Sequence, residues 1–200
     1  MGVLPASEKG RRCHQPDRPL EAPTARMESW QRSRGKRPRR RRGVSAMNAN
    51  SVLVATVGLG NIDQVRASLL EPMKRSLAAG TWSRIVLVPS KVTEELAGQL
   101  RAETRDAPIE ICPLPEAGNE DSLVPCREHI AMVFRRLIEQ GIDPAQIVLD
   151  FTRGTKVMSV AATVAALSCG IRRVQYVVGG QRDARGVVVP GTEQVRHGEL

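Results

Sequence analysis

The chain has few cysteines and histidines, and they do not fall into the patterns that metal sites need. The four cysteines include no C-x-x-C pair, and the three histidines add no ligand spacing. Zinc sites and disulfide frameworks both depend on such spacings. We therefore expect reduced structural thiols, no bound metal and no cofactor. These residues are Cys13, Cys112, Cys126, Cys169, His14, His129 and His197.

Long apolar runs are also missing. No stretch is long enough to cross a bilayer, and no secretory signal with a hydrophobic centre opens the chain. These absences predict a soluble, cytoplasmic protein without a membrane partner.

Most of the chain has no excess of basic over acidic residues, although the formal net charge is +9. Residues 1–46 hold 13 Lys and Arg against four acidic residues, so they carry the whole excess. Residues 47–200 are neutral overall, which predicts no general attraction of the folded part for a polyanion.

The basic tail, residues 1–46, is rich in Arg, Pro and Ser and has no aliphatic periodicity, so we expect it to be disordered. Its run Arg34–Arg42 is compatible with a nucleic-acid arm or a targeting signal. The favoured interpretation is upstream sequence from a misassigned start codon, because Met47 leads directly into an apolar strand. The predicted folded domain is 47–197.

From residue 51 onward, strand and helix patterns alternate. We expect helix 62–77 to kink or restart at Pro72. We also expect Val92, Leu96 and Leu100 to share the buried face of the next helix. The predicted strands are 51–57, 84–89, 109–113, 147–150 and 174–178, and the predicted helices are 62–77, from Ser90 or Thr93 to 104, 122–140 and 155–168. A terminal hairpin is predicted to follow. It includes Val187–Pro190 and ends near Val195.

This alternation predicts an α/β fold, a Rossmann-like three-layer sandwich with a mainly parallel sheet and a C-terminal β-hairpin. In the usual strand order 3-2-1-4-5, the first and fourth strands are neighbours. The crevice at their carboxyl ends is the expected ligand site.

Two turns with unusual chemistry follow those two strands. One is Gly58–Asn61, and the other is Thr152–Lys156. In the second, a buried strand ends at Asp150, turns through Gly154 and opens a helix. Because the N–H groups and the dipole of a helix N-terminus favour anions, and Arg153 and Lys156 add full charges, the pattern predicts a phosphate site.

Better-known phosphate motifs do not fit. Gly58-x-Gly60 lacks the third glycine of a dinucleotide fingerprint, since Asp63 stands there. The Gly154 turn is no Walker A motif either, because Val157 replaces the Ser or Thr that binds magnesium. An aspartyl-phosphate site at Asp150 lacks a downstream acidic cluster.

Asp150 has a second interpretation, as a cap that accepts backbone N–H bonds from its own turn. Arg127 and His129 lie early in the long helix. The sequence leaves two alternatives for them: they reach the crevice, or they are surface residues.

These residues resemble the CARF domains, the CRISPR-associated Rossmann-fold sensors of type III systems. The resemblance rests on Thr56–Asn61, on the run Asp150–Ser159 (where the family has D-x-T-G-G-T-K-x-M-S), and on Tyr176–Gly180 with Val189–Glu193. It covers about 51–195.

The resemblance implies a homodimer that binds cyclic oligoadenylate, tetra- or hexa-adenylate, across its two-fold axis. Phosphates would meet the Gly154–Lys156 turn, and the Gly58–Asn61 loop would line the adenine or ribose side. The candidate ligand-binding residues are Gly58, Leu59, Gly60, Asn61, Asp150, Thr152, Arg153, Gly154, Thr155 and Lys156.

Two departures from the family pattern stand out. Arg153 replaces the family's first Gly, which predicts a less permissive turn with an added phosphate contact. No R-x(4–6)-H pair of a HEPN ribonuclease is present, which leaves a stand-alone sensor without its own effector, a truncated gene product, or a partner of a separate effector protein.

Two other functions stay open. A ring nuclease would cleave the same ligand by aligning a ribose 2′-hydroxyl with the next phosphate, with Thr155, Lys156 and Arg153 stabilising charge. A Rossmann nucleotide-cofactor domain would bind NAD(P) instead.

Overall fold

The computed structural model describes residues 51–58, 69–104, 108–186, 188–189 and 191–200. The predicted tail 1–46, the residues Leu59, Gly60 and Asn61, and the stretch 62–68 of the first predicted helix lie outside these ranges.

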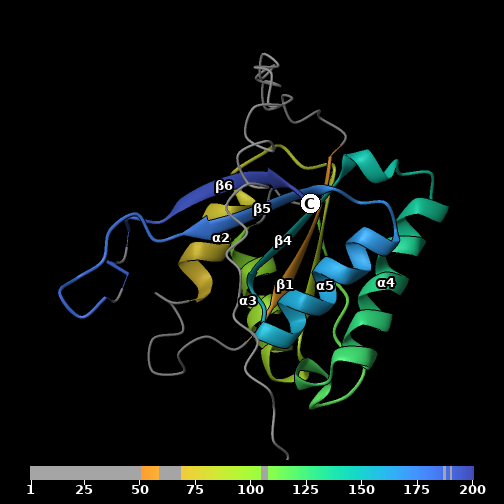
Figure 1. Cartoon of the computed structure of the whole chain (residues 1–200), viewed down its shortest axis with the longest axis horizontal. Helices are drawn as coiled ribbons and strands as arrows, with labels where there is room; N and C mark the ends of the chain where they lie inside the picture. Colours follow the sequence, from red (N-terminus) through yellow and green to blue (C-terminus); the bar gives the residue numbers. More distant parts are fainter. Residues whose placement is uncertain (1–50, 59–68, 105–107, 187, 190) are drawn as a thin grey trace, which may run out of the picture. The chain divides into compact units, whose positions relative to one another are not determined.

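Within the described residues, the sheet has six strands in the order β3-β2-β1-β4-β5-β6 (Figure 1). The first five are parallel, and β6 returns antiparallel to β5. The predicted Rossmann-like order and the C-terminal hairpin are therefore confirmed. The strands are β1 (Val52–Val57), β2 (Arg84–Pro89), β3 (Ile109–Ile111), β4 (Ile147–Arg153), β5 (Arg173–Val178) and β6 (Gln194–Glu199).

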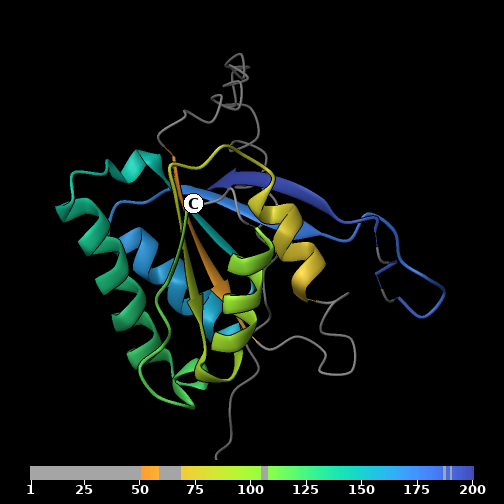
Figure 2. The same cartoon turned by 180° about the vertical axis from the view of Figure 1, so that it is seen from behind.

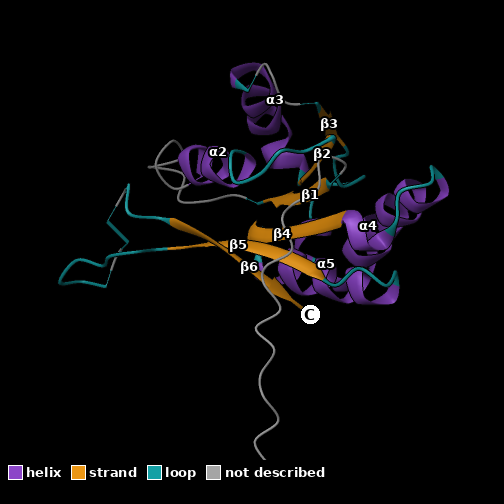
Figure 3. Ribbon diagram, turned by 90° about the horizontal axis from the view of Figure 1, so that it is seen from above, coloured by secondary structure: helices purple, strands orange, loops and turns teal. Residues whose placement is uncertain are grey.

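Helices cover both faces of this sheet, which gives the predicted three layers. One face carries α2 (Glu71–Leu77) and α3 (Glu94–Glu103), and the other carries α4 (Leu123–Glu139) and α5 (Lys156–Ser168), as Figures 2 and 3 show from behind and from above. Short 3-10 turns are η3 (Lys91–Thr93), η4 (Asn119–Asp121) and η5 (Pro144–Gln146). None of the helices in the described ranges is long and apolar enough to cross a membrane.

Central strands are buried on both faces, as expected for parallel strands between two helical layers. Every residue of β1 is buried. Its alternate side chains enter two separate cores: Val52 and Val54 pack with α4 and α5, whereas Leu53, Ala55 and Val57 pack with α2 and α3. This burial fixes the register of β1, because a slip of one residue would exchange the two sets.

Strand β4 contains an extra residue. Its register with β1 runs from Ala55 opposite Asp150 to Val57 opposite Arg153, so that two residues on β1 face three on β4. The Asp150 carboxylate accepts bonds from both the backbone N–H and the hydroxyl of Thr152, two residues on. Such local side-chain bonds compete with the strand ladder and account for the bulge.

The bulge explains one wrong prediction. The fourth strand does not end at Asp150 but continues through Phe151 and Thr152 to Arg153. Two other strand predictions were also wrong: the third strand ends at Ile111 rather than Pro113, and the return strand of the hairpin is Gln194–Glu199, with only an isolated bridge at Val188.

One helix prediction was wrong. Val92 is 59% exposed, because it lies in the 3-10 turn η3 before α3 rather than on the helix with the buried Leu100. On α5, Val160, Val164 and Leu167 are exposed. The helix changes type beside Pro72: Leu69 and Leu70 form a π-helical turn, and the α-helix α2 begins at Glu71. The part of the predicted helix before Leu69 lies outside the described residues.

Candidate functional site

The two turns singled out in the sequence meet at the carboxyl ends of β1 and β4. The N–H of Gly58 donates a hydrogen bond to the carbonyl of Arg153. A Cβ at Gly58 would lie 2.6 Å from the backbone nitrogen of Thr155 and 2.8 Å from the carbonyl oxygen of Arg153. Only glycine allows this approach of two backbones. The chain leaving β1 therefore lies directly against the turn that opens α5.

Gly154 is required for a second close approach. A Cβ there would lie 2.7 Å from the Thr56 hydroxyl and 2.9 Å from Cβ of Met158. The preceding residue, Arg153, ends β4, and no non-glycine residue in the described ranges has a positive φ. The expectation of a less permissive turn at Arg153 was therefore wrong, because this position is an extended strand residue.

Thr155 is the N-cap of α5. Its hydroxyl accepts a hydrogen bond from the N–H of Met158 (3.1 Å) and donates one to the carbonyl of Glu120 (2.7 Å). The first N–H groups of α5, those of Lys156 and Val157, have no carbonyl acceptor within their own helix. Lys156 is exposed and forms no ion pair with any residue in the described ranges. Among the described residues, this end of α5 thus presents N–H groups without an acceptor and a cation without an ion pair, which suits an anion.

Asp150 is a buried centre of hydrogen bonds, 1% exposed. Beyond the two bonds from Thr152, its carboxylate accepts one from the hydroxyl of Ser76 in α2 and one from Nε2 of Gln175 in β5 (3.2 Å). Gln175 also donates to the Ser76 hydroxyl at 2.7 Å. A buried carboxylate is tolerated when donors surround it in this way. Asp150 therefore supports the turn from beneath, in line with its interpretation as an acceptor of bonds from its own turn.

Arg153 contrasts with Asp150. Its Nε is buried and has no hydrogen-bond partner among the described residues. Burial lowers the pKa of this guanidinium, while the nearby carboxylates of Glu193 and Asp150 act in the opposite direction. An arginine remains charged in any protein environment. The end of β4 therefore holds a half-buried cation whose hydrogen-bonding capacity is unused.

This cation lines a hollow of about 310 Å³ between the ends of β4 and β5 and the arm of the hairpin. We use "hairpin arm" for the described residues between β5 and β6. The volume of the hollow lies at the lower end of the range for small-molecule pockets. The lining residues are Thr152, Arg153, Val177, Val178, Gly179, Arg182, Val188 and Glu193.

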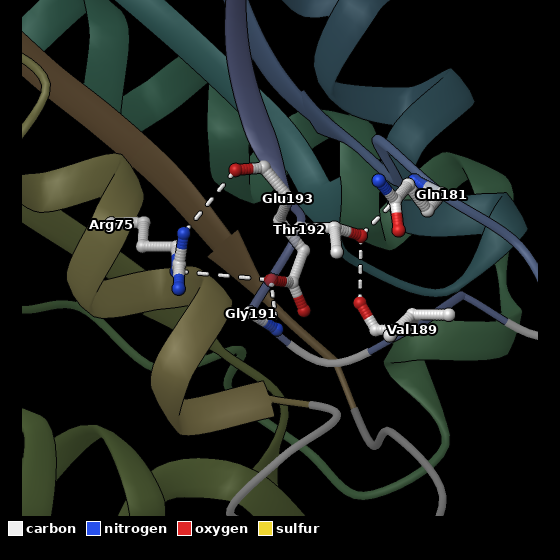
Figure 4. A network of polar contacts seen from close by, with 6 residues as sticks. All are labelled: Arg75, Gln181, Val189, Gly191, Thr192 and Glu193. Carbon is white, nitrogen blue, oxygen red and sulfur yellow. Dashed lines mark hydrogen bonds and ion pairs between the residues drawn. The ribbon is translucent and has the colours of Figure 1, made fainter.

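Glu193, at the base of the hairpin arm, is the acidic group of the hollow. Its side chain is 6% exposed, and Oε2 accepts a hydrogen bond from the N–H of Gly191 (2.8 Å) and lies 3.8 Å from Nε of Arg75 in α2 (Figure 4). Arg75 also donates to the carbonyl of Glu193 at 3.3 Å.

The hairpin arm is itself fixed by polar contacts. The Thr192 hydroxyl accepts from the N–H of Gln181 (3.1 Å) and donates to the carbonyl of Val189 (2.7 Å), as Figure 4 shows. A Cβ at Gly180 would collide with the carbonyl of Thr192, so the two chains cross in close contact there. Glu193 is therefore held at the hollow by the geometry of the arm.

The structure brings together most of the predicted site residues that it describes. Gly58, Gly154, Thr155 and Lys156 lie at the meeting point of the two turns, while Thr152 and Arg153 line the hollow beside it. Arg127 and His129 are not among the residues that line the hollow.

Arg127 pairs with Glu128 (3.5 Å), and Nε2 of His129 lies 3.3 Å from the carbonyl of Cys112. Burial lowers the pKa of His129. His129 therefore lies beside the segment that follows β3.

Sequence reasoning missed the acidic and hairpin side of the site. Glu193 and Arg182 are distant from β4 in sequence, and only the antiparallel return of β6 brings them to its end. The pair Gly179-Gly180 was the available signal, because it indicated a turn that would fold the chain back. Within the described ranges, no three His, Cys, Asp or Glu side chains gather where they could hold a metal ion.

No protein-family model matches this chain, and no curated protein matches it. Among solved structures, it is similar to Enterococcus italicus Csm6 bound to cyclic hexa-2′-fluoro-hexa-dAMP, at 14% identity and a TM-score of 0.51, covering 76% of this chain and 42% of that chain. It is also similar to Can2 from Sulfobacillus thermosulfidooxidans in complex with cyclic tetra-adenylate, at 17% identity and a TM-score of 0.49, covering 67% and 34%. A third is protein VC1899 from Vibrio cholerae, at 15% identity and a TM-score of 0.49, covering 66% and 32%.

The chain spans less than half of each of these proteins. At such low identity the likeness concerns the fold, and it agrees with the fold implied by the resemblance to CARF domains.

Proposed function

We propose that this chain is a CARF-type sensor that binds cyclic oligoadenylate as part of a type III CRISPR defence system. The carrying observation is the contact of Gly58 with the Arg153–Thr155 turn, which joins two strand-end turns beside the N-terminus of α5. Unpaired N–H groups and the free Lys156 suit the phosphates of such a ring. The ligand in the Csm6 structure, a cyclic hexanucleotide analogue, belongs to the same chemical class.

The proposed binding unit is a homodimer paired through α5. Val160, Val164 and Leu167 repeat at helical spacing and are 53%, 40% and 41% exposed. An apolar stripe of this kind is typical of an interface. It begins one turn after Lys156, so a second copy packed on it by two-fold symmetry would bring two Lys156 side chains to one ring.

Cleavage of the ring is the less favoured alternative. The hydroxyl of Thr155 already bonds to Glu120 and Met158, which leaves Lys156 and Arg153 as charge-stabilising groups without an evident base. Signal output in this proposal passes to an effector, either in a longer protein or in a separate one.

Calorimetric titration of the full chain with cyclic tetra- and hexa-adenylate tests the proposal. We expect saturable binding at one ring per two chains, and a loss of about tenfold or more in affinity for Lys156→Ala, because hydrogen bonds to charged groups have that worth. Lys91→Ala is the matched control, since Lys91 is an exposed lysine paired with Glu94 at 3.2 Å. NAD in place of the ring should give no heat, and chromatography of the same mixtures reports any cleavage.

The dimer is tested separately by native mass spectrometry. Val164→Glu should yield monomers that bind the ring weakly, because it buries a charge in the α5 stripe. Val92→Glu makes the same change at another exposed valine, in η3, and should stay dimeric.

Binding of NAD by the wild-type chain without binding of either ring would overturn the proposal in favour of a cofactor domain.

A further inference from the structure

The hairpin arm extends outward from the sheet, beyond the helices that cover it (Figure 1). Its two sides are joined to each other by backbone hydrogen bonds. The N–H of Gly180 donates to the carbonyl of Thr192 (2.9 Å), and the N–H of Val189 donates to the carbonyl of Gln181 (3.0 Å). These bonds give the arm its shape, but they do not attach it to the layers of the domain.

One side chain of α2 attaches the base of the arm. Nε of Arg75 lies 3.8 Å from Oε2 of Glu193, and Nη1 of Arg75 donates to the carbonyl of Glu193 at 3.3 Å (Figure 4). The same Oε2 accepts a hydrogen bond from the N–H of Gly191 (2.8 Å). Arg75 therefore contacts both the side chain and the backbone of the residue that directly precedes β6.

The burial of Glu193 makes this contact important. Its side chain is 6% exposed, whereas that of Arg75 is 42% exposed, so the arginine covers a carboxylate with little access to water. The Arg153 guanidinium is close enough for an electrostatic interaction with Glu193, but Arg75 makes the direct contact. Removing the partner of a buried charge costs far more than breaking a surface ion pair. Without Arg75, we expect Glu193 to move into water and the base of the arm to leave α2.

The same helix supports the strands beneath the Gly154 turn. The hydroxyl of Ser76 donates to the carboxylate of Asp150, and the carbonyl of Ser76 accepts from Nε2 of Gln175 at 3.1 Å. Two adjacent residues of α2 thus contact the hairpin arm on the one hand and β4 and β5 on the other. Helix α2 is therefore a common support for the arm and for the turn.

We propose that Arg75 and Glu193 form a clasp that fixes the base of the hairpin arm on α2, and that Arg75 is a positioning residue of the candidate site. The clasp holds Glu193, one of the lining residues, at the hollow beside the ends of β4 and β5. Opening of the clasp would move the arm away from β4 and widen the hollow. The effect on ring binding rests on the proposed function, whereas the clasp itself does not.

Hydrogen–deuterium exchange of the full chain without ligand tests the clasp. In Arg75→Met, peptides covering 191–196 should exchange at least about tenfold faster, because hydrogen bonds to charged groups have that worth and local opening exposes their amides. Lys74→Met is the matched control on the same helix, since Lys74 pairs with Glu71 (3.3 Å) and Glu103 (2.5 Å) instead. Arg and Lys have similar helix propensities, so both variants change α2 alike. The control should leave exchange in the arm at the wild-type rate.

A double-mutant cycle separates the clasp from the packing of the Arg75 side chain. Glu193→Gln removes the charge but keeps an acceptor for the N–H of Gly191. In this background, Arg75→Met should accelerate exchange by less than about threefold, because the interaction is already weakened. Arg75→Lys keeps the cation and should give exchange rates between those of the wild type and Arg75→Met.

Calorimetry with cyclic tetra-adenylate measures the role of the clasp in binding. We expect Arg75→Met to bind the ring about tenfold more weakly than the wild type, because part of each binding event would then be spent on ordering the arm. Lys74→Met should bind with wild-type affinity.

Each outcome decides one part of the inference. Wild-type exchange in Arg75→Met would overturn the clasp. Equal acceleration in Arg75→Met and Lys74→Met would overturn it too, because it would indicate a general loosening of α2. Faster exchange with unchanged ring affinity would overturn the positioning role of Arg75. Failure of the wild type to bind the ring would overturn the proposed function together with that role, and the exchange rates would still decide the clasp.

Discussion

Asp150 and Arg153 lie three residues apart on β4, and their charged groups differ in how many hydrogen bonds they make within the protein. The Asp150 carboxylate is fully buried and accepts bonds from Ser76, Thr152 and Gln175, which belong to α2, β4 and β5. The Arg153 guanidinium faces a hollow, and its Nε has no partner among the described residues. The carboxylate in the middle of the strand has its hydrogen bonds made, and Nε of the guanidinium at the end of the strand does not.

This difference distinguishes residues that support the site from residues of the proposed binding surface. A charged group whose bonds are made inside the protein stabilises the fold and offers nothing to a ligand. A half-buried charge with unused bonds costs free energy until a ligand arrives. We therefore expect substitutions in the Asp150 region to lower stability, and substitutions around Arg153 to lower affinity.

The largest expected effect is at Gly58. Gly58→Ala places a methyl group 2.6 Å from the backbone nitrogen of Thr155, so the two turns must separate. We expect the free energy of unfolding to fall by about 3 kcal/mol, measured by urea denaturation. Gly98→Ala in α3 is the control, because nothing lies within 4 Å of its Cβ, and it should raise stability by about 0.5 kcal/mol. A neutral Gly58→Ala would show that the close contact is unnecessary.

The next effect is at Asp150. Asp150→Asn sets an NH₂ group against the donors of Ser76 and Gln175, which should cost about 2 kcal/mol in urea denaturation. Asp143→Asn makes the same change at an exposed carboxylate that accepts from Ala145 at 2.8 Å, and it should cost less than about 0.5 kcal/mol. Equal losses of unfolding free energy at Asp150 and Asp143 would show that the buried carboxylate contributes no more to stability than the exposed one.

A smaller effect is expected at Thr155, which was a candidate catalytic residue in the sequence. Thr155→Ala removes the cap of α5 and should cost about 1 kcal/mol of unfolding free energy. Thr155→Ser keeps the hydroxyl and should retain both stability and ring affinity. A stable Thr155→Ala variant that lost ring cleavage would instead assign this hydroxyl to catalysis.

The smallest effect on stability is expected at Arg153. Arg153→Ala removes a half-buried guanidinium whose Nε has no partner among the described residues, so the free energy of unfolding should not fall and should rise by less than about 0.5 kcal/mol. The affinity for the ring should fall in the same preparation. A large loss of stability would place Arg153 with Asp150 and end the contrast between the two regions.

Much of the fold was predictable because it follows from periodicity. The strands around Val54, Val86 and Leu149 are apolar runs separated by helical patterns, and this spacing leads to the order that places β1 beside β4. The glycines after these strands then indicated the site, since backbones must approach closely there.

Other features depended on contacts that no local pattern contains. The bulge in β4 results from bonds between Asp150 and Thr152, and the burial of Asp150 depends on Ser76 and Gln175 from distant elements. Glu193 reaches the hollow only through the return of β6. Position along the chain alone therefore located the α5 side of the candidate site but not the hairpin side.

The additional residue in β4 has a consequence for how such a site changes over generations. Side chains of a strand alternate between its faces, so deleting one codon before Arg153 would turn that side chain to the opposite face of the sheet. A single in-frame deletion at the bulge is therefore enough to turn Arg153 away from the hollow.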